Sequence, residues 1–125
     1  MATRCIIKIK GSSIVLYKHW DGHPKSTLPW LKAFLNDFTT KRGIDTEYLA
    51  AQLVRSSALD AAKYGLDDSR HTGWGLLVAA KQEHIEIGQE YEYELQPEKN
   101  TVKVTSLYPK KSYIEHCTVK SIKEE

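Results

Sequence analysis

Apolar and polar residues alternate with a period of two at the start of the chain, which predicts a β-hairpin. Cys5, Ile7 and Ile9 fall on one face of a first strand and basic residues on the other, with Ile6 as an interruption. The short turn GSS then leads into a second strand over residues 14–20. The Asp-Gly step and the proline that follow predict the end of this strand.

A helical period replaces the alternation in the next segment. Thr27 is expected to cap a first helix, with Pro29 in its first turn and Gly43 directly after its last turn. Its apolar stripe consists of Leu31, Phe34, Leu35 and Phe38.

A second helix is predicted to begin at Asp45 or Thr46 and to run to about Tyr64, where Gly65 ends it. The helix is rich in Ala and Ser, so it is thin enough to lie close against a sheet or another helix. Arg55 stands among these small residues.

The period returns to two after a polar loop over residues 66–73. Further strands are expected over residues 74–80, 90–95, from residue 102 onward and over 113–122, with a turn at 96–100 and room for a short strand at 85–87. The element order β-β-α-α-β-β-β-β predicts an α+β fold: a mostly antiparallel sheet of five or six strands with two helices on one face. The βαβ alternation of a nucleotide-binding fold is absent from this order.

The 125 residues are expected to form a single domain, with residues 120–125 as a frayed tail. A net charge of +2 is only mildly basic and does not indicate a nucleic-acid-binding protein. No apolar run approaches the roughly 20 residues of a membrane span. Without a secretory signal, Cys5 and Cys117 are expected to be reduced thiols in a cytoplasmic protein.

The segment YKHWDGHP, residues 17–24, is the densest group of chemically versatile side chains in the chain. On a strand, Tyr17, His19 and Asp21 would project to the same side, with His23 as a further candidate, so the carboxylate could orient the imidazole. The pair could also bind a metal with His23, but the spacing lies outside familiar zinc patterns and Gly22 turns the chain away. We therefore expect neither a metal nor a cofactor; the purely structural alternative is a strand end followed by a turn.

A second candidate is the loop over residues 67–75, DDSRHTGWG. The backbone next to its glycines, with three polar side chains and an indole, could cradle an anion. The residues concerned are Arg70, His71, Thr72, Gly73 and Trp74. The alternative is a turn whose glycines relieve crowding around the tryptophan.

Arg55 supports two interpretations. If its helix packs closely on the sheet, the guanidinium is partly buried and needs an acidic partner or an anionic ligand. Otherwise it reaches solvent along its apolar stem.

A nucleic-acid platform is a weaker candidate. Basic residues of the first strand, such as Lys8, could combine with Tyr91 and Tyr93 to stack bases. The interleaved Glu90, Glu92 and Glu94 would repel phosphates, so nucleic acid is not the expected partner.

Taken with LPWLKAF, QLVRS and YGLDDSRHTGWG, the segment LYKHWDGHP resembles a set of short, uncharacterised prokaryotic and phage-type proteins. These share a strand-ending signature: an aromatic residue, any residue, His, any residue, Asp-Gly, any residue, Pro. The resemblance covers roughly residues 4–75 and implies no activity. It implies that His19, Asp21, Gly22, Pro24, Arg55 and the 67–75 loop belong together. This chain has His23 where an aromatic residue is usual.

Three functions remain open from the sequence. The first is a binding module for a polar or anionic small ligand or partner group, with His19 and Arg55 as donors, Asp21 as the acceptor, and Trp20 or Trp74 as a wall. The second is a small hydrolase or phosphoesterase, with His19 as general base oriented by Asp21. The third is an interaction protein that forms a homodimer through an edge strand, with the Tyr91/Tyr93 hairpin as that edge.

Overall fold

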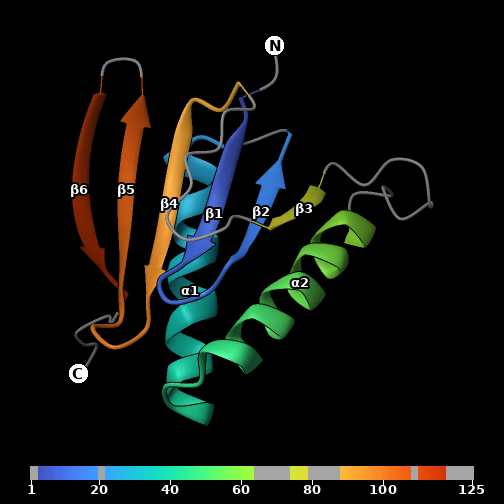
Figure 1. Ribbon diagram of the computed structural model, residues 1–125, viewed down its shortest axis with the longest axis vertical. Helices are drawn as coiled ribbons and strands as arrows, with labels where there is room; N and C mark the ends of the chain where they lie inside the picture. The colour runs from blue at the N-terminus through green and yellow to red at the C-terminus, as the bar shows by residue number, and fades with distance from the viewer. Residues whose placement is uncertain (1–2, 20–21, 64–73, 79–87, 108–109, 118–125) are drawn as a thin grey trace.

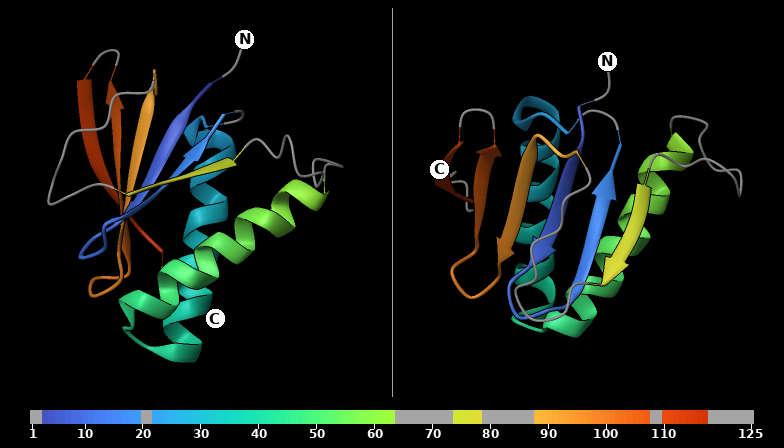
Figure 2. Two further views of the ribbon diagram at one scale, coloured as in Figure 1. Left: turned by 45° about the vertical axis from the view of Figure 1, so that its right-hand side comes forward. Right: turned by 45° about the horizontal axis from the view of Figure 1, so that its top comes forward.

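A six-stranded sheet with two helices on one of its faces forms the protein (Figures 1 and 2). The computed structural model describes residues 3–19, 22–63, 74–78, 88–107 and 110–117. Its elements are β1 (Cys5–Ile9), β2 (Ile14–Lys18), α1 (Pro24–Arg42), α2 (Thr46–Lys63), β3 (Trp74–Val78), β4 (Tyr91–Gln96), β5 (Thr101–Leu107) and β6 (Lys110–His116). The predicted α+β class and element order are confirmed. The short strand expected at residues 85–87 lies outside the described residues.

The strand order is β3-β2-β1-β4-β5-β6. Strands β1 and β4 are parallel, and every other neighbouring pair is antiparallel. The sheet thus consists of two antiparallel halves that meet along one parallel seam. Strand β4 lies inside the sheet between β1 and β5, so the prediction that the Tyr91/Tyr93 hairpin forms an edge is wrong.

The core lies between the sheet and the helices. Alternate positions of the strands pack against the apolar stripes of α1 and α2, as the sequence predicts; the buried members include Cys5, Ile7, Ile9, Leu16, Leu31, Leu35, Leu53, Tyr93, Leu95, Val102 and Val104. Because Tyr93 is fully buried on this face and Lys8 belongs to the opposite one, the two do not form a base-stacking platform. Ile6 is fully buried on the face that points away from the helices, which we call the back face.

Helix α1 begins three residues before the predicted cap. His23 is its N-cap, and its Nδ1 atom accepts a hydrogen bond from the backbone of Lys25 at 3.1 Å. Thr27 is instead fully buried, and its hydroxyl oxygen lies 3.5 Å from the amine of Lys18 on β2. The prediction failed because a threonine that suits a cap also suits a buried contact, and histidine is an uncommon cap.

The end of α1 and the start of α2 follow the prediction. Gly43 follows α1 with a φ of 85°, a conformation that favours glycine. Asp45 caps α2, with its Oδ1 atom accepting from the backbone of Tyr48 at 3.2 Å. The predicted end of α2 at Gly65 lies outside the described residues.

Two strand boundaries among the described residues differ from the prediction by more than one residue. Strand β2 ends at Lys18, before Trp20. Strand β6 occupies Lys110–His116, three residues earlier than expected at its start, because it begins pairing as soon as the chain turns back from β5, at Leu107 opposite Lys110. Its start is polar, so apolar alternation did not reveal it.

The connection from β2 into α1 is fixed by Gly22. Its backbone N–H donates to the carbonyl of Thr3 at 2.8 Å, and its carbonyl accepts from the buried hydroxyl of Tyr93 at 2.6 Å. A Cβ atom at this position would lie 2.8 Å from Cβ of Cys5 and 2.8 Å from the carbonyl oxygen of Thr3. Only glycine fits this approach to the start of β1 without displacing backbone.

Replacing Gly22 by alanine is therefore expected to lower the free energy of unfolding by about 2–3 kcal/mol, the usual cost of overpacking a rigid site. Equilibrium urea unfolding measures the loss. Gly75→Ala is the matched control, since a Cβ atom there meets Tyr17 at an ordinary 3.5 Å. Equal losses in the two variants would contradict the role given to the close approach.

Both cysteines are free and buried. Burial raises the pKa of the Cys5 thiol to about 12, although the nearby Lys18 opposes the shift, and burial raises the pKa of the Cys117 thiol to about 11. Both thiols therefore stay neutral in the folded protein at pH values where the unfolded chain ionises them.

The free energy of unfolding is accordingly expected to fall as the pH rises above about 9. Each buried thiol makes its full contribution to the free energy of unfolding at pH values below the pKa of the unfolded chain. As the pH rises from there toward the pKa of the folded protein, this contribution falls by up to roughly 1.4 kcal/mol per pH unit for each thiol. Urea unfolding between pH 8 and 10.5 should show a shallower pH dependence in Cys5→Ala than in the wild type. Identical slopes would refute the assignment.

Candidate functional site

The end of β2 holds the described part of the YKHWDGHP segment. Tyr17 and His19 project to the back face, and Lys18 projects between the sheet and the helices. Gly22, His23 and Pro24 form the connection to α1. Trp20 and Asp21 lie outside the described residues, so the proposed role of Asp21 toward His19 stays a prediction.

Tyr17 holds the imidazole of His19. The phenol oxygen lies 2.6 Å from Nδ1 of His19, and the two rings meet edge to face with centroids 5.9 Å apart. Gly75 stands opposite Tyr17 on β3, and its missing side chain leaves space for the phenol ring. Strand alternation in the sequence predicted Tyr17 on the same side as His19, but Tyr17 was not among the predicted site residues; the contact between the two rings gives it that place.

Arg4 joins this pair from the neighbouring strand. The β1–β2 register pairs Cys5 with Lys18, so extending it by one residue places Arg4 opposite His19 on the back face. The Arg4 side chain is half-buried, and a Cβ atom at Gly88 would lie 3.1 Å from its Nη1 atom. Gly88 thus lets the guanidinium pass close to the backbone. We call Arg4, Tyr17 and His19 the strand-end cluster.

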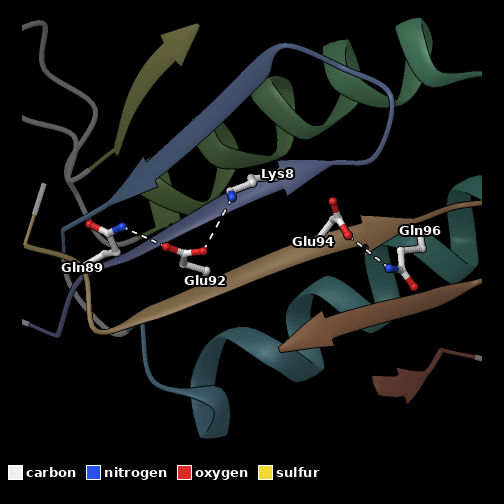
Figure 3. Close-up of polar contacts among 5 residues, drawn as sticks. All are labelled: Lys8, Gln89, Glu92, Glu94 and Gln96. Carbon is white, nitrogen blue, oxygen red and sulfur yellow. Dashed lines mark hydrogen bonds and ion pairs between the residues drawn. The ribbon is translucent and has the colours of Figure 1, made fainter. Parts of the chain in front are cut away.

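Two carboxylates of β4 on the back face have polar partners of their own (Figure 3). Glu92 lies 3.6 Å from the amine of Lys8 and accepts a 3.0 Å hydrogen bond from the buried amide of Gln89. Farther along β4, Glu94 accepts from the amide of Gln96. Within residues 3–19, 22–63, 74–78, 88–107 and 110–117, no carboxylate forms an ion pair with Arg4.

Trp74 belongs to the opposite side of the sheet. Its ring packs against Trp30 of α1 at 5.5 Å, its indole N–H donates to Asp60 of α2 at 3.3 Å, and the amine of Lys18 lies 5.3 Å from its centroid. The register explains this placement, since Trp74 pairs with Lys18 whereas Gly75 pairs with Tyr17. Trp74 therefore connects the helices to the sheet, and the structure does not bring it onto the face of His19.

Arg55 is exposed on α2. The buried positions Leu49, Leu53, Ser57 and Ala61 recur every four residues and turn Arg55 outward. Of the two interpretations of Arg55, the structure supports the side chain in solvent. The loop residues predicted to belong to the same binding site, Arg70, His71, Thr72 and Gly73, lie outside the described residues.

The described part of the chain contains no group of three or more His, Cys, Asp or Glu side chains that could hold a metal ion. His23 uses its Nδ1 atom to cap α1 and packs against Tyr91 at 5.3 Å between ring centroids. The cap and this packing give His23 a structural role.

Comparison with protein-family models, with curated proteins and with solved structures finds no significant match to this chain. The resemblance to the short prokaryotic and phage-type proteins therefore stays a prediction. Neither α1 nor α2 is long and apolar enough to cross a membrane.

Replacing Tyr17 by phenylalanine is expected to free the His19 ring from its preferred tautomer. A phenol that donates to Nδ1 leaves the imidazole proton on Nε2, so we expect this tautomer to predominate in the wild type, and nitrogen-detected NMR measures the distribution directly. The variant should show both tautomers in exchange and a stability loss of about 0.5–1.5 kcal/mol. Tyr91→Phe, which keeps the ring contact with His23, is the control. An unchanged tautomer in Tyr17→Phe would contradict the role of the phenol.

Proposed function

We propose that the protein is a binding module that holds an anionic group, carried by a small molecule or a partner, at the strand-end cluster. The observation that carries the proposal is the 2.6 Å contact between the Tyr17 hydroxyl and Nδ1 of His19. A hydroxyl that donates to Nδ1 makes the opposite ring nitrogen, Nε2, the donor. The imidazole is thereby held as a donor before any ligand arrives, which lowers the entropic cost of binding.

Arg4 supplies the charge that the imidazole lacks. A guanidinium offers a fixed fork of N–H donors that matches the oxygens of phosphate or carboxylate. The half-buried position opposite His19 limits the side-chain freedom that binding would remove. Glu92 is paired with Lys8, and the ion pairs among the described residues leave the guanidinium of Arg4 without a carboxylate within 4 Å.

Binding is proposed in preference to hydrolysis because, among the described residues, the group that contacts Nδ1 of His19 is the phenol of Tyr17. A general base gains from a carboxylate at that nitrogen, which stabilises the imidazolium formed during the reaction. A phenol offers much less stabilisation.

The unpaired thiols of Cys5 and Cys117 are in keeping with the reducing conditions of the cytoplasm, where we expect the protein to act.

An NMR titration with inorganic phosphate, pyrophosphate and acetate tests the proposal. Saturable shifts should centre on Arg4 and His19, and Arg4→Gln or His19→Ala should weaken binding about tenfold, as expected for the loss of one charge-assisted hydrogen bond. Arg55→Gln, which removes an exposed arginine elsewhere, should bind as the wild type does. Shifts scattered over surface lysines, or an equal loss in Arg55→Gln, would refute the site.

A further inference from the structure

Strand β6 ends the strand order, and no other strand of the described residues pairs with its outer edge (Figures 1 and 2). Six of its seven residues are exposed, and Tyr113 and Ile114 retain 43% and 50% of their accessible surface. The strand contains no proline, and it pairs with β5 in an unbroken register along its whole length. An edge of this kind carries a row of backbone N–H and C=O groups that can pair with another strand.

The sequence of β6 is complementary to itself in one orientation. If two copies align antiparallel about Tyr113, Lys111 of each copy faces Glu115 of the other, and the two Tyr113 rings face each other. A parallel in-register pairing would instead place lysine against lysine and glutamate against glutamate. Opposite charges and aromatic pairs at facing positions stabilise a strand pair, whereas like charges destabilise it.

We propose that a second copy of this chain pairs antiparallel with β6, centred on Tyr113, to extend the sheet across two molecules. The charge complementarity of Lys111 and Glu115 and the exposed Tyr113 favour this occupant over an unrelated strand. Glu115 also lies 3.2 Å from the amine of Lys32 on α1, through Oε1. A carboxylate has acceptor capacity for a second cation, so this contact persists when Lys111 of the second copy approaches.

The contact is small, so the dimer is expected to depend on concentration. One seven-residue strand extends about 24 Å, and a single strand pair buries less than the 1,200–2,000 Å² typical of stable complexes. Sedimentation equilibrium from micromolar to millimolar concentration should therefore show a reversible monomer–dimer equilibrium that weakens with added salt. A monomer throughout this range would overturn the proposal.

Charge reversal tests the register. Lys111→Glu places two glutamates at both facing pairs of a homodimer, and Glu115→Lys places two lysines there, so each variant should dimerise at least tenfold more weakly than the wild type. A mixture of the two variants restores opposite charges at both pairs and should recover a dimer that contains one copy of each. Homodimers of either variant as strong as those of the wild type would overturn the register.

Cysteine cross-linking tests the two-fold axis. In the proposed pairing the Cβ atoms of residue 113 in the two copies lie about 4.5–5.5 Å apart, so Tyr113→Cys should form an intermolecular disulfide upon mild oxidation. Tyr48→Cys is the matched control, because Tyr48 is 52% exposed on α2, away from β6. The two native thiols are buried, which limits their reaction. Equal cross-linking at both positions would reveal random collision and would overturn the proposal.

Discussion

The close approach of Gly22 to the start of β1 is the constraint on which the rest of the molecule depends. The backbone of Gly22 bonds to Thr3, and its carbonyl receives the hydroxyl of Tyr93 from β4, across the parallel seam. One residue thus connects the two halves of the sheet to the first turn of α1. Because an unpaired buried hydroxyl is costly, the backbone carbonyl of residue 22 has to stay within reach of Tyr93, and this requirement fixes the path of the connection.

Because side chains alternate along a strand, the predicted site residues lie on two different faces of the sheet. Consecutive residues of β2 serve different layers: Tyr17 and His19 reach the back face, whereas Lys18 reaches Thr27 and the ring of Trp74. The indole is thus committed to packing between the helices and the sheet. The strand-end cluster takes its third member, Arg4, from β1.

Sequence periodicity predicted the layers well, because burial on one face imposes the same alternation on every strand. It also predicted Asp45 or Thr46 as the N-cap of α2, because these residue types, placed directly before the apolar positions of a helix, are preferred caps. The local pattern of apolar residues does not show which strands pair when they are distant in the sequence. The parallel seam, the interior position of β4 and the register position of Arg4 opposite the end of β2 depend on strand order, which hydropathy does not encode. His23 was missed as a cap because two histidines beside an aspartate suggested chemistry.

The environment of Gly22 shows that part of the signature between Tyr17 and Pro24 is required by the fold and not by a ligand. Of the segment from Tyr17 to Pro24, the glycine is required by the approach to Cys5 and Thr3, and the histidine and proline that follow begin α1. Tyr17 and His19 belong instead to the proposed binding site. Descendants of a common ancestor that keep the glycine and proline but exchange His19 would inherit this architecture without the proposed binding chemistry, so selection for that chemistry would act at positions 4, 17 and 19.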